Sequence, residues 1–260
     1  MNLTTWLNPQ VLGLAILFIF ILCFLFFRYR PFIKTIQPPN PDQCREISPF
    51  RQLLQALSRA LENGKGVHLS SGNGGVSGIR GASGIASLVM LYRIAQKSAR
   101  NDQPPLATSG DGVLTILAQD TLHQSFTDAG SQRRFDPALG QVTGITPFSY
   151  AAGAMLEVAD RPLEVSLLAG HFGPEATLIA LAASDHSPQV TIAGSESLPA
   201  QAALLAAADE TLIGEELFAG GAYLQVNQAH RASLAAQDVL RWLIILLILA
   251  GISLKLLGVL

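Results

Sequence analysis

The sequence predicts an α/β fold: a Rossmann-like, doubly wound and mostly parallel sheet of about six strands, flanked by N- and C-terminal transmembrane helices. Two observations lead to this prediction. Short β-prone runs that end in a small residue and glycine recur through the middle of the chain, and helix-start signals follow them. Long apolar runs occupy residues 11–27 and 242–260.

Six β-prone runs carry the repeated pattern. They are Val67–Gly72, Leu106–Gly110, Val142–Gly144, Val165–Gly170, Val190–Gly194 and Thr211–Gly214. Their starts lie 21 to 39 residues apart, which leaves room for the crossover that joins neighbouring parallel strands. Strands that alternate with helices indicate a parallel sheet with helices on both faces. The predicted helix starts are Ser109–Asp111, Thr146–Pro147, Gly173–Glu175, Ser197–Pro199 and Glu215–Glu216.

Three further segments complete the predicted domain. A helix should begin at the cap-and-proline pair Ser48–Pro49 and stop at Asn63–Gly64. Its apolar residues at helical spacing are Phe50, Leu53, Leu54, Leu57 and Leu61. Residues 123–140 should form an irregular excursion, the kind of insertion that often covers a site. The last helix should begin at Glu215, break at Gly220–Gly221 and continue into the second apolar run.

The first apolar run has 17 residues and no charged side chain. Because about 20 helical residues span a bilayer, we expect a transmembrane helix over residues 11–29. The sequence Phe26-Phe27-Arg28 offers no signal-peptide cleavage site, which favours a helix that stays in the chain. Positive charge follows this run at Arg28, Arg30 and Lys34, and the positive-inside rule therefore places the domain in the cytoplasm and the N-terminus outside.

The second apolar run is interrupted by Lys255, whose long stem can carry its ammonium to the membrane interface. We expect a transmembrane helix over residues 238–260, and the alternative is an amphipathic helix on the membrane surface. The predicted parts are a short external N-terminus (1–10), a transmembrane helix (11–29), a Pro-rich juxtamembrane linker (30–47), a cytoplasmic Rossmann-like domain (48–237) and the C-terminal helix (238–260). The expected location is the cell inner membrane.

Charge and cysteine content limit the partners. Residues 35–237 carry 12 Lys/Arg and 18 Asp/Glu, a net charge of −6, which argues against nucleic acid and against broad docking on anionic lipid. The two cysteines, Cys23 and Cys44, lie in the first apolar run and in the linker, so no disulfide is expected.

In sheets of this class, ligands bind beyond the carboxyl ends of the strands, where the glycine-containing turns fall. The most glycine-dense turn is Gly72-Asn73-Gly74-Gly75-Val76-Ser77-Gly78. Its amides are suited to cradling an anion. Its spacing differs from the dinucleotide fingerprint, however, and the same glycines would also permit a tight turn with a helix packed closely on the sheet.

Polar side chains gather at the same predicted edge. His171 and Glu175 could serve as base and orienter with Ser109 or Ser195 as nucleophile, although neither serine lies in a Gly-x-Ser-x-Gly elbow. Asp111, Glu175 and Ser195 are equally typical of helix caps. The candidate ligand-binding residues are Ser71, Gly72, Asn73, Gly74, Gly75, Ser109, Gly110, Asp111, His171, Glu175, Ser195 and Glu196.

Several common site signatures are absent from the sequence. It has no phosphate loop of the Gly-x-x-x-x-Gly-Lys-Ser/Thr type, no His-Glu-x-x-His and no paired-cysteine zinc spacing. No metal site is predicted, since nothing supports a magnesium site from Asp111, Glu196 and Glu215, and no cofactor is identified. His68 lies in an apolar strand, which favours a core residue over a ligand.

The strand-end phrases resemble an uncharacterised family of bacterial membrane-anchored proteins, known only as a domain of unknown function. The resemblance covers about residues 66–225 and implies a bacterial membrane protein, but no activity, cofactor or catalytic residue. The phrases that carry it are His68–Gly72, Ala107–Asp111, Phe172–Ala176, Ala193–Ser195 with Leu198–Gln201, and Ile213–Ala219.

The leading functional hypothesis is a membrane-anchored cytoplasmic domain that binds a small ligand or a protein partner as a non-catalytic sensory or assembly module. Anchors at both ends suit lateral assembly into a homo-oligomer or with a membrane protein. One alternative is an enzyme, a hydrolase or transferase, acting on a small or lipid-derived substrate. Another is a structural membrane scaffold, which predicts a strand-end edge filled by packing.

Overall fold

The computed structural model describes residues 17–22, 25–26, 46–78, 80–186, 190–224 and 228–256. The chain divides into two compact units. The first is Arg45–Val226, and the second combines Met1–Cys44 with Asn227–Leu260.

The first unit contains one six-stranded sheet in which every strand pair is parallel, so the predicted α/β fold is confirmed. The strand order is β3-β2-β1-β4-β5-β6. This order, which the sequence did not predict, reverses direction between β1 and β4, as in dinucleotide-binding folds. The strands are β1 (Gly66–Gly72), β2 (Leu106–Ser109), β3 (Gly140–Val142), β4 (Leu163–His171), β5 (Val190–Ser195) and β6 (Glu210–Leu212).

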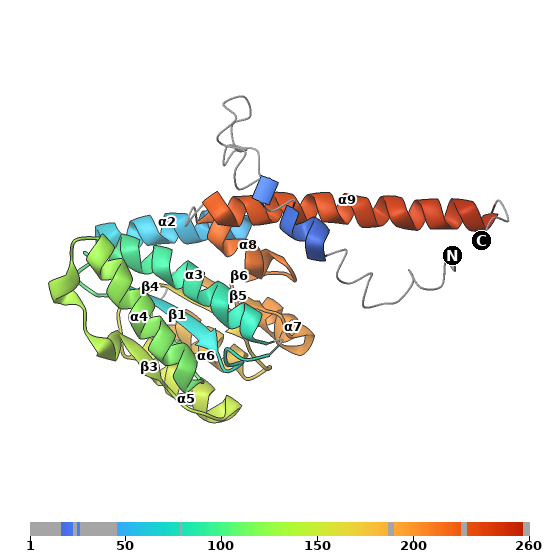
Figure 1. Cartoon of the computed structure of the whole chain (residues 1–260). Helices are drawn as coiled ribbons and strands as arrows, with labels where there is room; N and C mark the ends of the chain where they lie inside the picture. The colour runs from blue at the N-terminus through green and yellow to red at the C-terminus, as the bar shows by residue number, and fades with distance from the viewer. Residues whose placement is uncertain are drawn as a thin grey trace. The chain divides into compact units, whose positions relative to one another are not determined.

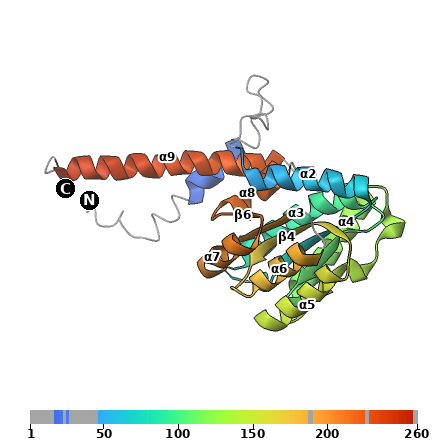
Figure 2. The same ribbon diagram turned by 180° about the vertical axis from the view of Figure 1, so that it is seen from behind.

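Helices cover both faces of the sheet. One face carries α2, α3, α4 and α8, with α3 packed against each of the other three (Figure 1). The opposite face carries α5, α6 and α7 (Figure 2). The helices are α2 (Ser48–Asn63), α3 (Gly81–Ser98), α4 (Gly112–Asp128), α5 (Pro147–Ala159), α6 (Ala176–His186), α7 (Leu198–Ala207) and α8 (Glu216–Tyr223).

Local capping explains why the helices begin where the sequence predicts. Asp111 caps α4, because its Oδ1 accepts a hydrogen bond of 2.9 Å from the amide of Leu114. Thr146 and Ser149 form a capping box at the start of α5. The prediction for Ser48 was wrong: it lies inside the first turn of α2, with Ile47 at the cap, and its Oγ donates to Glu210 of β6.

The burial of α2 differs from the predicted apolar pattern at Leu61. Phe50, Leu53 and Leu57 are buried as predicted, whereas Leu61 is 47% exposed because the buried face of the last turn is formed by Ala60. Phe50 also stacks on Tyr223 of α8, with 5.1 Å between ring centroids.

The irregular excursion is shorter than predicted and does not cover the candidate site. Helix α4 continues to Asp128, and the remaining irregular part contains the short 3₁₀ turns η4 (Gln132–Arg134) and η5 (Pro137–Leu139). Arg134 donates to the carbonyl of Asn101, whose side chain bonds the carbonyl of Lys65. Since those two residues precede β2 and β1, the excursion lies at the amino end of the sheet, opposite the candidate site.

The predicted break at Gly220–Gly221 is also wrong. Helix α8 runs through both glycines and ends at Tyr223, and a separate helix α9 spans Gln228–Leu256. Gly220 instead lets α8 approach α3, because a Cβ there would lie 2.4 Å from the sulfur of Met90.

In the second unit, α9 has 29 residues and includes a stretch, Ala232–Leu249, with a mean hydropathy of 1.8. Among the described residues this is the one stretch long and apolar enough to cross a membrane. Residues 17–22 and 25–26 of the first apolar run are helical. The rest of that run, the linker and both cysteines lie outside the described residues, so the N-terminal anchor remains a prediction.

Candidate functional site

The carboxyl ends of β1 and β4 are neighbours at the point where the strand order reverses. Gly72, the last residue of β1, pairs in register with His171, the last residue of β4. In open α/β sheets this switch point is where ligands bind, because the loops after the two strands diverge to opposite faces. We call Gly72–Gly75, His171 and Glu196 the switch-point cluster.

The glycine-rich turn packs directly on the end of β4. The amide of Asn73 donates to the carbonyl of His171 at 3.0 Å. Gly72 has φ +77°, and a Cβ there would lie 2.2 Å from the same carbonyl oxygen. A Cβ on Gly74 would lie 2.4 Å from the Cβ of His171. At least two glycines therefore serve close packing, as one of the two interpretations of the turn expected.

His171 pairs with a different candidate residue from the one that the sequence suggested. Its Nδ1 lies 2.9 Å from Oε1 of Glu196, which follows β5, and both side chains are partly exposed, at 18% and 21%. The predicted pairing with Glu175 was wrong. Glu175 folds back on its own loop, where its Oε1 accepts from the amide of Gly173 at 3.0 Å.

The candidate serines and Asp111 are engaged in local turns. Ser109 Oγ accepts from the amide of Asp111 at 3.1 Å. Ser195 Oγ accepts from the amides of Phe172 and Ser197, each at 3.2 Å. Together with the cap that Asp111 provides to α4, these bonds match the capping alternative. They give neither serine a histidine partner, which a nucleophile of this type would need.

Ser71 differs from the other candidate hydroxyls. Its side chain is buried, and its Oγ has no hydrogen-bond partner within the described part of the chain. Side chains alternate along β1, and Ser70 faces α5, so Ser71 faces the α3 side just before the glycine-rich turn. Buried polar atoms without a partner are uncommon in folded proteins and often mark functional sites.

Sequence reasoning missed a buried polar chain that ends at the same turn. His68 lies between two hydroxyls, with Nδ1 2.8 Å from Ser166 Oγ and Nε2 2.9 Å from Thr108 Oγ1. Thr108 donates to Ser70, Ser70 bonds the Tyr150 hydroxyl, and that hydroxyl accepts from the amide of Gly72 at 3.2 Å. The sequence held one signal of this chain: His68 and Ser70 alternate with apolar residues in the strand, so both side chains face the same side of the sheet.

Burial keeps this chain uncharged. It lowers the pKa of His68 to about 3, and the charge of Arg161 acts in the same direction. It also raises the pKa of Tyr150 to about 12, although the hydrogen bonds from Ser70 and Gly72 oppose the shift. Both rings are therefore neutral near pH 7. The contact from Thr108 to Ser70 favours the neutral tautomer in which His68 donates through Nε2 and accepts from Ser166 at Nδ1. His68 is thus a satisfied core residue.

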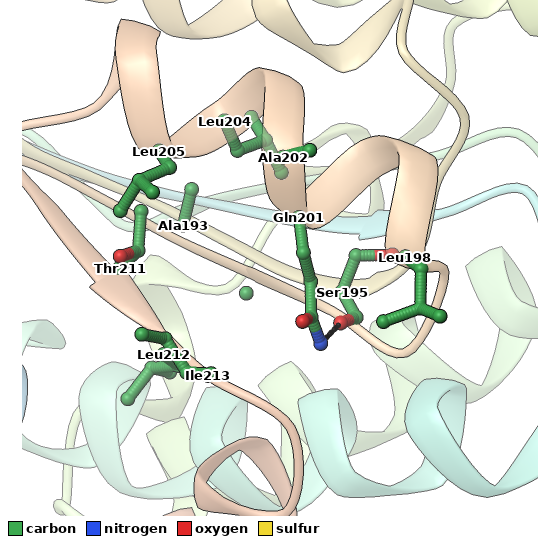
Figure 3. A pocket seen from close by; sticks show the side chains of 11 residues that line it. Ala193, Ser195, Leu198, Gln201, Ala202, Leu204, Leu205, Thr211, Leu212 and Ile213 are labelled. Atoms are coloured by element: carbon green, nitrogen blue, oxygen red, sulfur yellow. Dashed lines mark hydrogen bonds between the residues drawn. The ribbon is translucent and has the colours of Figure 1, made fainter.

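A second feature, also missed from the sequence, is a pocket of about 240 Å³ between α7 and strands β5 and β6 (Figure 3). We call it the α7 pocket. The residues that line it are Ala193, Gly194, Ser195, Leu198, Gln201, Ala202, Leu204, Leu205, Thr211, Leu212 and Ile213. In Figure 3, the side chain of Gln201 extends from α7 to the backbone of Ser195, where it donates to the carbonyl oxygen.

The described residues contain no group of three or more His, Cys, Asp or Glu side chains placed to hold a metal ion.

A parallel sheet with this strand order and a polar cluster at its switch point defines a Rossmann-like α/β protein. The chain belongs to the family described as a domain of unknown function, DUF6754, whose model matches residues 4–260. No curated protein and no solved structure matches it.

Proposed function

We propose that this chain is a membrane-anchored α/β protein whose domain binds a small polar ligand or a protein partner at the switch-point cluster, without turnover. The observation that carries the proposal is the His171–Glu196 pair. It joins the end of β4, which borders the switch point, to the residue that follows β5. The pair remains partly exposed and caps no helix, whereas Ser109, Ser195 and Asp111 are engaged in local turns.

The chemistry of the cluster favours a ligand that carries hydroxyl or amide groups. The contact between the two side chains uses Nδ1 of His171 and Oε1 of Glu196. The other ring nitrogen, Nε2, and the other carboxylate oxygen, Oε2, are therefore the atoms that the pair offers to a ligand. The unpartnered hydroxyl of Ser71 lies on the strand that leads into the cluster. No cofactor is assigned to this site.

A second candidate function is catalysis on a small or lipid-derived substrate. It is favoured by the 2.9 Å contact between His171 and Glu196, because a carboxylate that orients a histidine is typical of general-base sites. The backbone hydrogen bonds of Ser109 and Ser195 weigh against a serine nucleophile. A structural scaffold remains the third candidate, and the close packing of the glycine-rich turn on His171 is what it expects.

The proposed location is the cytoplasmic face of the cell inner membrane, with the N-terminus outside. The basic residues Arg28, Arg30 and Lys34 after the first apolar run support this orientation, and the hydropathy of Ala232–Leu249 supports an anchor. The proposed partners are the bilayer, a second copy or another membrane protein, and the small ligand. The acidic domain argues against nucleic acid.

Binding to the full chain in lipid nanodiscs tests the proposal. Adenosine, ATP and NAD are suitable first probes, because the fold places such ligands at the switch point. We expect at least one probe to bind in calorimetric titration, and His171→Ala and Glu196→Gln each to weaken it by about tenfold, which is the usual effect of losing one hydrogen bond to a charged group.

His123→Ala is the matched control, since His123 is an exposed histidine outside the cluster. It should bind as the unmodified chain does. The proposal would be abandoned if the unmodified chain bound none of the probes and cross-linking in cells captured neither a second copy nor a partner.

A further inference from the structure

We propose that the α7 pocket binds the alkyl chain of a cationic amphiphile that reaches it from the bilayer. The pocket is distinct from the switch-point cluster, so binding at the two sites is tested separately, but the inference rests on the membrane anchor of the proposed function. Three features of the described residues carry it: the size and lining of the pocket, its exposed apolar rim and the charge of the surrounding chain.

The lining is apolar and the volume suits a short alkyl chain. Alanine, leucine and isoleucine side chains form most of the wall, while Ser195, Gln201 and Thr211 contribute the polar groups. Gln201 already donates to the carbonyl of Ser195, so this polar group is satisfied within the wall (Figure 3). The pocket's volume of about 240 Å³ lies just below the range of roughly 300–1,000 Å³ that is typical of small-ligand pockets, which suits a short chain.

Three large apolar side chains of the pocket are exposed. Leu198 is 77% exposed, Leu205 63% and Ile213 58%. They come from both walls, since the two leucines belong to α7 and Ile213 follows β6. Apolar side chains clustered around a cavity are typical of a binding site. The proposed anchor, Ala232–Leu249, would hold the chain where amphiphiles are concentrated, which makes an amphiphile the proposed occupant.

The charge around the pocket selects the head group. The sequence from residue 165 to residue 230 contains seven Asp and Glu residues but no Lys or Arg. Glu196 directly follows Ser195 of the lining, and Glu215 and Glu216 follow Ile213 within three residues. A carboxylate or phosphate head would be repelled by this field, whereas an ammonium head would be attracted. The proposed ligand is therefore an alkylammonium amphiphile.

Photo-cross-linking tests this assignment on the full chain in phosphatidylcholine nanodiscs. The probe is an octylamine that carries a diazirine on its tail, and mass spectrometry locates the modified peptides. We expect modification at Leu198, Leu205 or Ile213. Unlabelled octylamine should compete better than octanol, and octanol better than octanoate. Octylamine should compete roughly fifteenfold better than hexylamine, because each buried methylene contributes about fourfold in affinity.

A matched pair of variants on α7 separates pocket binding from partitioning into the lipid. Ala202 lines the pocket and is exposed, so Ala202→Trp fills the cavity without disturbing the core, whereas Ala206 is exposed on the same helix outside the lining. Ala202→Trp should abolish pocket modification and Ala206→Trp should retain it, with unchanged far-UV circular dichroism in both. His171→Ala should also retain it.

Three results would overturn the proposal. One is pocket modification that persists in Ala202→Trp, and another is modification confined to peptides of α9. The third is competition by octanoate equal to that by octylamine, which would contradict the role of the acidic surroundings.

Discussion

His68 shows how the burial of one residue produces a pH dependence. Its imidazole lies in the middle of the sheet, is kept neutral by burial, and contacts a hydroxyl at each ring nitrogen. Protonation would place a charge in a fully buried site and would remove the acceptor that Ser166 uses. The residue therefore contributes to stability only while it remains neutral.

The direction of the effect follows from the two pKa values. The pKa of His68 is about 3 in the folded chain and 6.5 in an unperturbed imidazole. Between these values the unfolded chain binds a proton that the folded chain does not, so stability is lost as the pH falls from 6.5 towards 3. The full loss from this residue is on the order of a few kcal/mol.

Urea unfolding at pH 7, 6 and 5, followed by circular dichroism, measures this loss. His68→Asn should unfold with a shallower dependence on pH than the unmodified chain, whatever its stability at pH 7. His123→Asn, at an exposed position, should keep the original dependence. If the free energy of unfolding fell equally between pH 7 and pH 5 in the unmodified chain and in His68→Asn, His68 would not titrate as described.

At the scale of the elements, Tyr150 joins α5 to the strand that ends in the glycine-rich turn. Its hydroxyl accepts from the amide of Gly72 and bonds Ser70, and its ring packs beside Phe172 after β4, with 6.4 Å between centroids. The Tyr150 side chain thus fixes the positions of α5, β1 and the turn of the switch-point cluster relative to one another.

Tyr150→Phe should therefore destabilise the fold by about 1–3 kcal/mol, because it leaves the buried Gly72 amide without an acceptor. Tyr92→Phe is the control: it also removes a hydroxyl bond, of 2.6 Å to Asp128, but at an exposed position, and should cost no more than about 0.5 kcal/mol. Equal midpoints for the two variants in denaturant unfolding would contradict the structural role assigned to Tyr150.

The elements themselves were predictable because their signals are local. Each strand run, and caps such as Asp111 and Thr146, are determined by residues within one turn of the chain. Strand order was not predictable, because it depends on which crossover passes to the opposite face. The excursion after α4 was predicted to begin at residue 123, whereas α4 continues to Asp128, because the sequence there does not indicate where the helix stops.

The candidate site was predictable in position but not in its contacts. Placing the polar residues at the strand ends required only the alternation of strands and helices. The partner of His171 was predicted four residues away, at Glu175, because proximity in sequence was the available guide. Its actual partner, Glu196, lies 25 residues later, and the parallel register of β4 and β5 brings the two together. The polar chain through Tyr150 and the α7 pocket likewise depend on tertiary packing.

At the scale of the whole molecule, both proposals depend on a domain held beside a membrane. An anchored domain is confined near lipid-derived ligands and near other membrane proteins, which a domain diffusing in bulk solution is not. The orientation rests on the charges that follow the first apolar run and on the absence of charged side chains before it.

The most direct test of this claim is the labelling of single cysteines by a membrane-impermeant maleimide. Both native cysteines are first replaced, as Cys23→Ser and Cys44→Ser. Leu156→Cys then places one thiol on α5, at a position that is 61% exposed, and Asn2→Cys places another at the N-terminus. In intact cells we predict labelling of Asn2→Cys alone, with Leu156→Cys labelled only after the inner membrane is permeabilised. Labelling of Leu156→Cys in intact cells would contradict the cytoplasmic location of the domain.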